Sequence, residues 1–149
     1  MRLETAKLGG MFALSLKQPW ATLLVHGLKT IEVRRWQTVR RGRVLIHAAR
    51  LPDDRREAWA HVPPELERAA RRVGGIVGAG NLVACLKYRS EEAFACDQAK
   101  HLNDPSWFEK PVLYGFAFAN LAALSFRPCP GGMRFFTVDL SEHVPPVPT

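Results

Sequence analysis

The sequence predicts an α+β fold: a small mixed β-barrel of five or six strands with short flanking helices. Short apolar segments typical of strands recur along the chain, and the helical segments between them are short. Strands and helices do not alternate in a regular βαβ order, which disfavours a parallel sheet covered by helices. The 149 residues suit one domain, and 47% of them are apolar, which is enough for a core.

The beginning of the chain predicts two strands with a helix between them. Residues 12–16 and 44–49 are short apolar runs, which are typical of strands. A helix of two to three turns is expected from Pro19 to Gly27. Proline suits the first helical position, where its missing N–H costs nothing, and glycine commonly follows the last position.

Residues 29–36 predict a further strand with two different faces. Ile31 and Val33 alternate with polar or aromatic residues, and this period of two indicates a half-buried strand. The two aliphatic side chains then face the core. The opposite face carries three side chains: Glu32, Arg34 and Trp36.

The rest of the chain predicts further helices and strands. Proline followed by acidic residues favours helix starts within residues 52–72, and residues 91–101 are also predicted to be helical. The predicted strands are residues 76–88, 112–124 and 133–140. With no internal repeat or linker in view, we expect residues 1–10 as an N-terminal tail, 11–141 as one domain and 142–149 as a proline-rich C-terminal tail.

Positive charge is concentrated in the first half of the chain. The net charge is +7; residues 1–72 have a net charge of +8, whereas residues 73–149 have −1. Five arginines lie within ten residues: Arg34, Arg35, Arg40, Arg41 and Arg43. One-sided positive charge favours binding to phosphate backbones. The alternative is a solvated basic face that aids solubility.

Other classes of protein are disfavoured by the sequence. The three cysteines are widely spaced and the five histidines are scattered, so neither a disulfide framework nor a metal site is expected. No apolar run is long enough to cross a bilayer, and residues 1–10 do not resemble a signal peptide. We therefore expect a cytoplasmic protein with no membrane contact, no metal and no cofactor.

Two adjacent motifs resemble a known family. Residues 13–20 read ALSLKQPW and residues 27–34 read GLKTIEVR. Together they resemble the ASC-1 homology (ASCH) family, which is related to the PUA RNA-binding domains, and the resemblance extends over residues 11–141. It implies a PUA-like barrel with a cleft beside the first helix, and RNA or other nucleic acid as the partner. Some related small proteins hydrolyse modified nucleosides such as N4-acetylcytidine.

The residues themselves also predict a nucleotide-holding cleft beside this helix. A helix start attracts anions, arginine can grip phosphate with two hydrogen bonds, and an aromatic ring can stack on a base. We assign nucleic-acid binding to Lys17, Gln18, Lys29, Glu32, Arg34, Trp36, Arg40, Arg41 and Arg43. The ligand would be RNA, another single-stranded nucleic acid or a nucleotide.

Several of these residues have a structural alternative. Glu32 and Arg34 can form an ion pair on the strand face, and Trp20 is expected to be a core residue. His47, in an apolar strand, is expected to be an interior histidine with its hydrogen bonds satisfied. The glycine-rich residues 74–80 do not match a phosphate-binding loop, so we interpret them as permitting strand curvature or bulges.

Three functions remain open at this point. The first is a binding module for RNA or single-stranded nucleic acid. The second is a hydrolase of a modified nucleoside, or a ribonuclease, that uses Lys29 and Glu32. The acetylcytidine hydrolases have a nucleophilic threonine where this chain has Glu32, and Thr30 lies two residues earlier, so the resemblance does not extend to that nucleophile. The third is a protein–protein adaptor.

Overall fold

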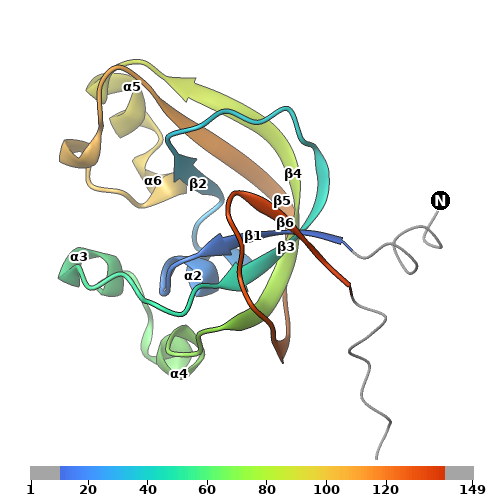
Figure 1. The fold of residues 1–149 in the computed structure, drawn as a ribbon. Coiled ribbons are helices and arrows are strands. Elements are labelled where there is room, and N and C mark those ends of the chain that lie inside the picture. The colour runs from blue at the N-terminus through green and yellow to red at the C-terminus, as the bar shows by residue number, and fades with distance from the viewer. Residues whose placement is uncertain (1–10, 140–149) are drawn as a thin grey trace, which may run out of the picture.

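Six strands form a single curled sheet in the computed structural model, which describes residues 11–139 (Figure 1). The strand order is β2-β5-β4-β3-β1-β6. β1 and β3 are parallel and all other neighbours are antiparallel, so the sheet is mixed. The strands are β1 (Met11–Leu16), β2 (Ile31–Arg34), β3 (Gly42–Ala48), β4 (Gly75–Tyr88), β5 (Leu113–Pro128) and β6 (Phe135–Val138).

The sheet curls into a half-barrel, and the predicted α+β fold, a small mixed sheet with short helices, is confirmed. Its curvature lies mainly in the long strands β4 and β5, whose pairing shifts register three times between Ile76 and Ala84. Such bulges bend a strand and increase its twist. Gly78 lies in this part of β4, and a Cβ atom there would collide with Val25 and with the main chain of Ala122. The glycine-rich segment therefore permits curvature and close packing.

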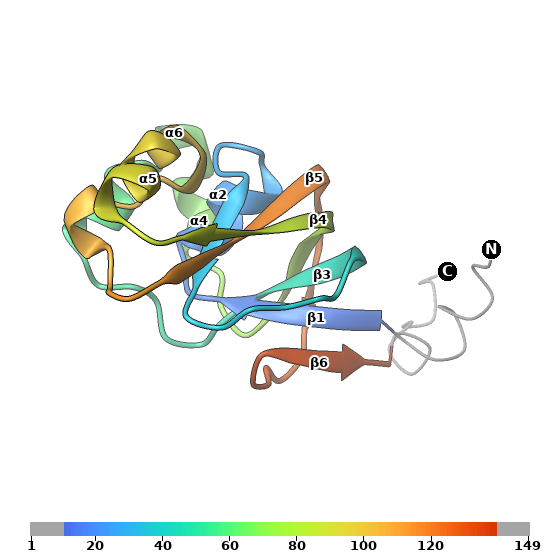
Figure 2. The same cartoon turned by 90° about the horizontal axis from the view of Figure 1, so that it is seen from above.

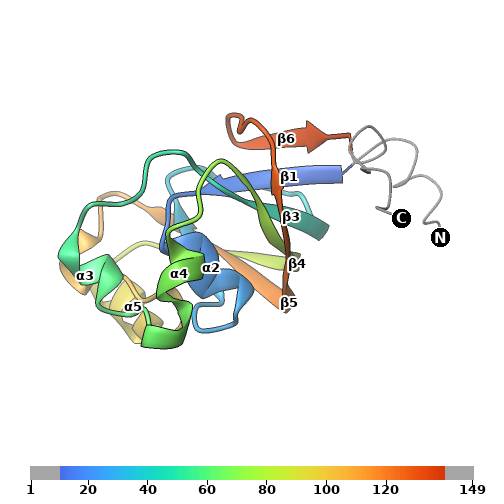
Figure 3. The ribbon, with the colours of Figure 1, turned by 90° about the horizontal axis from the view of Figure 1, so that it is seen from below.

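The helices are short and gather at one end of the sheet, as Figures 2 and 3 show from two sides. They are α2 (Trp20–Val25), α3 (Arg56–Trp59), α4 (Glu67–Ala70), α5 (Glu91–Cys96) and α6 (Gln98–His101), with 3₁₀ turns at Pro64–Leu66 and Pro105–Trp107. All six residues of α2 are buried, and this helix packs against β3, β4 and β5.

Helix α2 is shorter than the two to three turns that we predicted. The N–H groups of Leu28 and Lys29 both donate to the Leu23 carbonyl, at 3.0 and 3.1 Å, and so turn the chain back. Gly27 has a φ of +77° in this turn, a conformation that glycine adopts without strain. Gly27 directly follows the C-cap His26, so the predicted role of this glycine at the end of the helix is confirmed.

Aromatic side chains fill the opening between the two edge strands. Trp36 follows β2 and Phe135 lies in β6, and their ring centroids are 5.5 Å apart. Trp36 also meets Phe116 of β5 edge-on at 5.0 Å, and Phe116 is fully buried. The half-barrel is thus closed on this side by packing and not by strand pairing.

Three predictions concern residues that lie wholly or partly outside the described part of the chain. These are the tails at residues 1–10 and 142–149 and the end of the last strand at Leu140. The other strands lie within a few residues of their predicted positions. The predicted helix at residues 91–101 is divided at Asp97 into α5 and α6.

Candidate nucleic-acid interface

A cleft of about 410 Å³ brings together four of the predicted binding residues. They are Lys17 after β1, Lys29 before β2, and Glu32 and Arg34 within β2. The loop after β3 and the segment after α6 complete the walls. The whole lining is Ser15, Lys17, Trp20, Lys29, Glu32, Val33, Arg34, Ala49, Asp53, Arg55 and Asn103.

Lys29 lies at the base of this cleft and is only 1% exposed. Its Nζ donates to the His101 carbonyl at 2.7 Å and lies 3.4 Å from Glu32 Oε1. The same atom lies 4.8 Å above the Trp20 ring, a cation–π distance. Burial lowers the pKa of Lys29, and the negative charge of Glu32 only partly offsets this effect.

Glu32 joins the two cations of the cleft. Its Oε1 faces Lys29, while its Oε2 accepts from Arg34 Nε at 3.2 Å and lies 3.1 Å from Arg34 Nη2. Arg34 Nη2 also donates to the Ser15 carbonyl at 2.8 Å, which ties β2 to β1. Within residues 11–139 no hydrogen bond uses Arg34 Nη1. The predicted structural ion pair is therefore present, and one edge of the guanidinium remains available to a ligand.

Asp53, Arg55 and the Trp20 ring form another part of the cleft wall, and Trp107 continues it in an adjoining hollow. Asp53 Oδ2 accepts from Trp20 Nε1 at 2.8 Å and from Arg55 Nη2 at 2.7 Å. Burial alone would raise the pKa of Asp53, but these hydrogen bonds outweigh it and lower the pKa to about 2. The Arg55 guanidinium lies 3.7 Å above the Trp107 ring, and this ring meets Trp20 edge-on.

His101 supports the base of the cleft as a neutral ring. Its Nδ1 accepts from the Asn103 N–H at 3.0 Å, so Nε2 carries the proton and donates to the Phe94 carbonyl at 2.7 Å. Burial lowers the pKa of His101, which is consistent with this assignment. The ring is therefore fixed by these two hydrogen bonds, and the main-chain carbonyl of His101 accepts from Lys29.

Two neighbouring hollows extend the cleft into a groove. One, of about 400 Å³, shares Val33, Arg34, Arg55 and Asn103 with the cleft and adds Trp36 and Trp107. The other, of about 340 Å³, shares Ser15, Lys17 and Ala49 and adds residues near His47. Because neighbouring hollows share lining residues, we treat the three as one groove, which we call the basic groove.

The remaining predicted site residues lie elsewhere. Gln18 is fully buried: its Nε2 donates to the Arg72 carbonyl at 2.9 Å, and its Oε1 accepts from the Thr22 N–H at 3.0 Å. The side chain thus connects the start of α2 to the end of α4. The N–H groups of Ala21 and Leu23 are also bonded to the chain itself, so the start of α2 does not present them to an anion as we had expected.

Three further predicted arginines, in the β2–β3 connection and at the start of β3, do not line the basic groove. Arg40 covers the Phe12 ring at 3.4 Å. Arg41 donates to the carbonyls of Thr38 and Arg40, and Arg43 donates to Asn81 Oδ1 and the Asn120 carbonyl. Each of these side chains is therefore held against its own part of the fold.

Two structural interpretations from the sequence are confirmed. Trp20 is 7% exposed and belongs to the core, although one edge lines the cleft. His47 is 1% exposed, with Nδ1 bonded to Ser15 Oγ at 2.9 Å and Nε2 to the Cys129 carbonyl at 2.8 Å. Neither side chain is an independent binding group.

Sequence reasoning missed the wall formed by Asp53, Arg55, Asn103 and Trp107. Asp53 was interpreted only as part of a helix-start signal, and no binding role was assigned to Asn103. No pattern in the sequence places Trp107 near Arg55, whose guanidinium lies 3.7 Å above its ring.

The described part of the chain contains no helix that is long and apolar enough to span a bilayer. Nor do residues 11–139 bring together three or more His, Cys, Asp or Glu side chains in an arrangement that would hold a metal ion.

Comparison with known proteins gives one family and one fold. The family model "ASCH domain" matches residues 14–122. Two curated relatives, activating signal cointegrator 1 from Mus musculus and from Homo sapiens, are each 54% identical to this chain over 39 residues. These residues are 26% of this chain and 7% of each relative. The matched segment thus spans a small part of the length of these relatives.

The fold also resembles solved structures of an ASCH protein from Zymomonas mobilis. The crystal structure of ASCH from Zymomonas mobilis gives a TM-score of 0.63 at 15% identity, covering 88% of this chain and 89% of that one. A substituted variant of the same protein gives a TM-score of 0.62 at the same identity. At this level of identity the likeness concerns the fold.

Proposed function

Because the chain belongs to the ASCH domain family, we propose that it is a binding module that holds RNA, or another single-stranded nucleic acid, in the basic groove. ASCH domains have a PUA-like fold, and the family is generally RNA-binding. The observation that carries the proposal is the placement of Lys17, Arg34 and Arg55 around one cleft with tryptophan in its wall. Cations beside aromatic rings suit phosphates and bases.

The shape of the groove favours a polymer over a single nucleoside. Each of its three hollows has the volume of a small-ligand site, and they adjoin in a row. In the proposed complex, Lys17 and Arg34 Nη1 contact phosphate, and bases lie against Trp36 and Trp107.

The three cysteines within the described residues are not paired in disulfides, which supports the expected cytoplasmic location.

A fluorescence-anisotropy titration tests this function. Labelled single-stranded RNA, single-stranded DNA and duplex are titrated at two salt concentrations. Affinity for the bound polymer should fall steeply with salt, with a log–log slope of about 0.7 per neutralised phosphate on single strands. No binding of any polymer at low salt would contradict the proposal.

Arg34→Ala tests the assignment of the cleft within this function. It removes a guanidinium that has one unused edge, so affinity should fall by about tenfold, as for loss of a charged hydrogen bond. Circular dichroism should show that the variant is folded. Unchanged affinity in a folded variant would place the binding site elsewhere.

One observation also favours hydrolysis of a modified nucleoside or RNA in the same cleft. A buried ammonium with a lowered pKa, that of Lys29, touches the carboxylate of Glu32, and such pairs can transfer protons in catalysis. Incubation with N4-acetylcytidine and with short RNA, followed by chromatography, tests this second candidate. Turnover that disappears in a Glu32→Gln variant shown by circular dichroism to be folded would establish it, and no product from the wild-type protein would exclude these substrates.

A further inference from the structure

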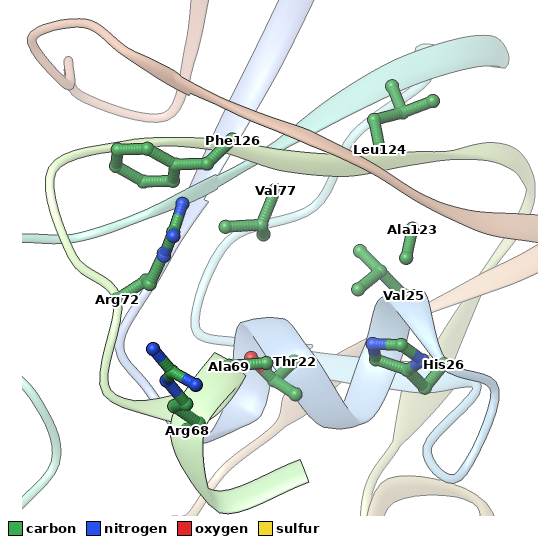
Figure 4. Close-up of a pocket in the computed structure, with 10 residues that line it drawn as sticks. All are labelled: Thr22, Val25, His26, Arg68, Ala69, Arg72, Val77, Ala123, Leu124 and Phe126. Atoms are coloured by element: carbon green, nitrogen blue, oxygen red, sulfur yellow. The ribbon is translucent and has the colours of Figure 1, made fainter.

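A second pocket, of about 320 Å³, lies between α2, α4 and the strands β4 and β5 (Figure 4). It shares no lining residue with the cleft. Its lining is Thr22, Val25, His26, Arg68, Ala69, Arg72, Val77, Ala123, Leu124 and Phe126. We call it the α2–α4 pocket. A ligand there would leave the basic groove open.

The floor of the α2–α4 pocket is apolar. Val25 and Val77 are 4% and 9% exposed and form its base. Leu124 is 48% exposed beside them, and Phe126 closes one end of the pocket in Figure 4. Covering an exposed aliphatic surface of this kind with another apolar side chain is favourable by the hydrophobic effect.

Two arginines stand at the rim of this apolar floor. Figure 4 shows Arg68 and Arg72 at one end of the pocket and His26 at the other. Both arginines are exposed, and neither guanidinium forms an ion pair with any residue in the 11–139 range. The main chain at Arg72 is fixed, because its carbonyl accepts from the buried Gln18. The pocket therefore combines a fixed apolar floor with two unpaired positive charges.

This combination fits an acidic peptide better than a nucleic acid. Nucleic-acid bases bind by stacking on aromatic rings, and among the apolar residues that line the pocket only Phe126, at one end, has such a ring. The other floor residues are aliphatic and offer no stacking surface. A large apolar side chain fills such a floor, and neighbouring carboxylates complement the two arginines.

We propose that the α2–α4 pocket docks a partner protein through an acidic peptide segment with one large apolar anchor residue. The anchor would lie over Val77 between Val25 and Leu124, and carboxylates on the same segment would pair with Arg68 and Arg72. Because this pocket and the basic groove are separate, the domain can hold nucleic acid and the partner at the same time. The proposal does not depend on which nucleic acid the groove binds.

The test is an NMR titration of the ¹⁵N-labelled protein with a short synthetic peptide that has leucine at its centre and glutamates on both sides. Amide signals of Thr22, Val77 and Leu124 should move, and those of Lys29 and Glu32 should not. A peptide with serine in place of leucine should produce much smaller shifts. Absence of shifts at the pocket residues at millimolar peptide would overturn the proposal.

Matched variants separate this pocket from general attraction between a basic protein and an acidic peptide. Arg68→Ala and Arg72→Ala should each weaken peptide binding by about threefold, as for exposed charge pairs. Arg71→Ala removes the same charge next to them but outside the pocket, and should have a smaller effect. Equal losses in all three variants, or displacement of the peptide by single-stranded RNA, would overturn the assignment.

Discussion

The basic cleft and the connection between β2 and β3 are both rich in cations, yet the fold treats their charges differently. In the cleft, Lys29 is 1% exposed and shares one carboxylate with Arg34. Arg41 in the connection and Arg43 at the start of β3 are exposed, and within the described residues they donate only to neutral groups of the chain itself. The density of arginine in the sequence is highest in the connection, whereas the organised charges are in the cleft.

This difference shows what distinguishes a built site from a charged surface. Holding two cations and a carboxylate with little water requires several fixed partners, here the carbonyls of Ser15 and His101. An exposed arginine needs no such support, because water solvates it. The cleft should therefore be sensitive to single substitutions in stability and in binding, and the connection should not.

Removing the shared carboxylate should have the largest effect. Glu32→Gln leaves Lys29 buried without a counter-charge, so the free energy of unfolding should fall by about 3 kcal/mol. Urea denaturation measures the loss. Glu109→Gln is the control: it breaks the pair with Arg35, whose side chains are 77% and 51% exposed, and should change stability little. Equal losses of unfolding free energy in the two variants would contradict the claim that charges in the cleft matter more to stability than exposed charges.

The second-largest expected effect is a loss of stability at low pH, which arises at Asp53 in the cleft wall. The pKa of Asp53 is lowered to about 2, so its stabilising contribution is complete above its ordinary value near 3.8 and is lost as pH falls through about 2. The loss amounts to about 2 kcal/mol. Urea denaturation at several pH values should therefore show a steeper decline below about pH 4 in the wild type than in Asp53→Asn.

The exposed neighbour Asp54 provides the control for this prediction. Asp54→Asn should leave the acid dependence of the wild type essentially intact, because this side chain makes no hydrogen bond within the described residues. A wild type and an Asp53→Asn variant with parallel pH profiles would contradict the proposed role of the Asp53 carboxylate.

The smallest expected effect is a difference in RNA affinity between a variant in the cleft and a variant in the β2–β3 connection. Lys17→Ala and Arg41→Ala each remove one exposed positive charge, but only Lys17 lines the cleft. Lys17→Ala should weaken RNA binding by about threefold to fivefold and reduce the salt slope by about 0.7. Arg41→Ala should produce a smaller change in anisotropy titrations. A larger loss from Arg41→Ala would move the interface to the β2–β3 connection.

Sequence periodicity predicted the parts of the site that depend on local structure. Alternation in residues 29–36 placed Glu32 and Arg34 on one face, and they do form an ion pair. It could not predict that Lys29 is buried, because that depends on the His101 carbonyl, 72 residues away. Asp53 and Trp107 are far apart in the sequence and are linked through Arg55, which donates to Asp53 and lies over the Trp107 ring.

Helix α2 shows both what local signals predict and where they stop. Proline and glycine marked its two ends, and Gly27 forms the turn that ends it. Gln18 was predicted to face a ligand because it precedes a helix, yet its amide is used to join α2 to α4. Hydrogen bonds between distant segments, which no local pattern encodes, decide such cases.

Photo-crosslinking tests the central claim most directly. Single-stranded RNA that contains 4-thiouridine is crosslinked to the wild-type protein, and mass spectrometry identifies the modified residues. The account predicts crosslinks at Trp36 and Trp107, beside Arg34 and Arg55 in the basic groove. Crosslinks confined to the segment around Arg41 would contradict it and assign nucleic-acid binding to the exposed arginines.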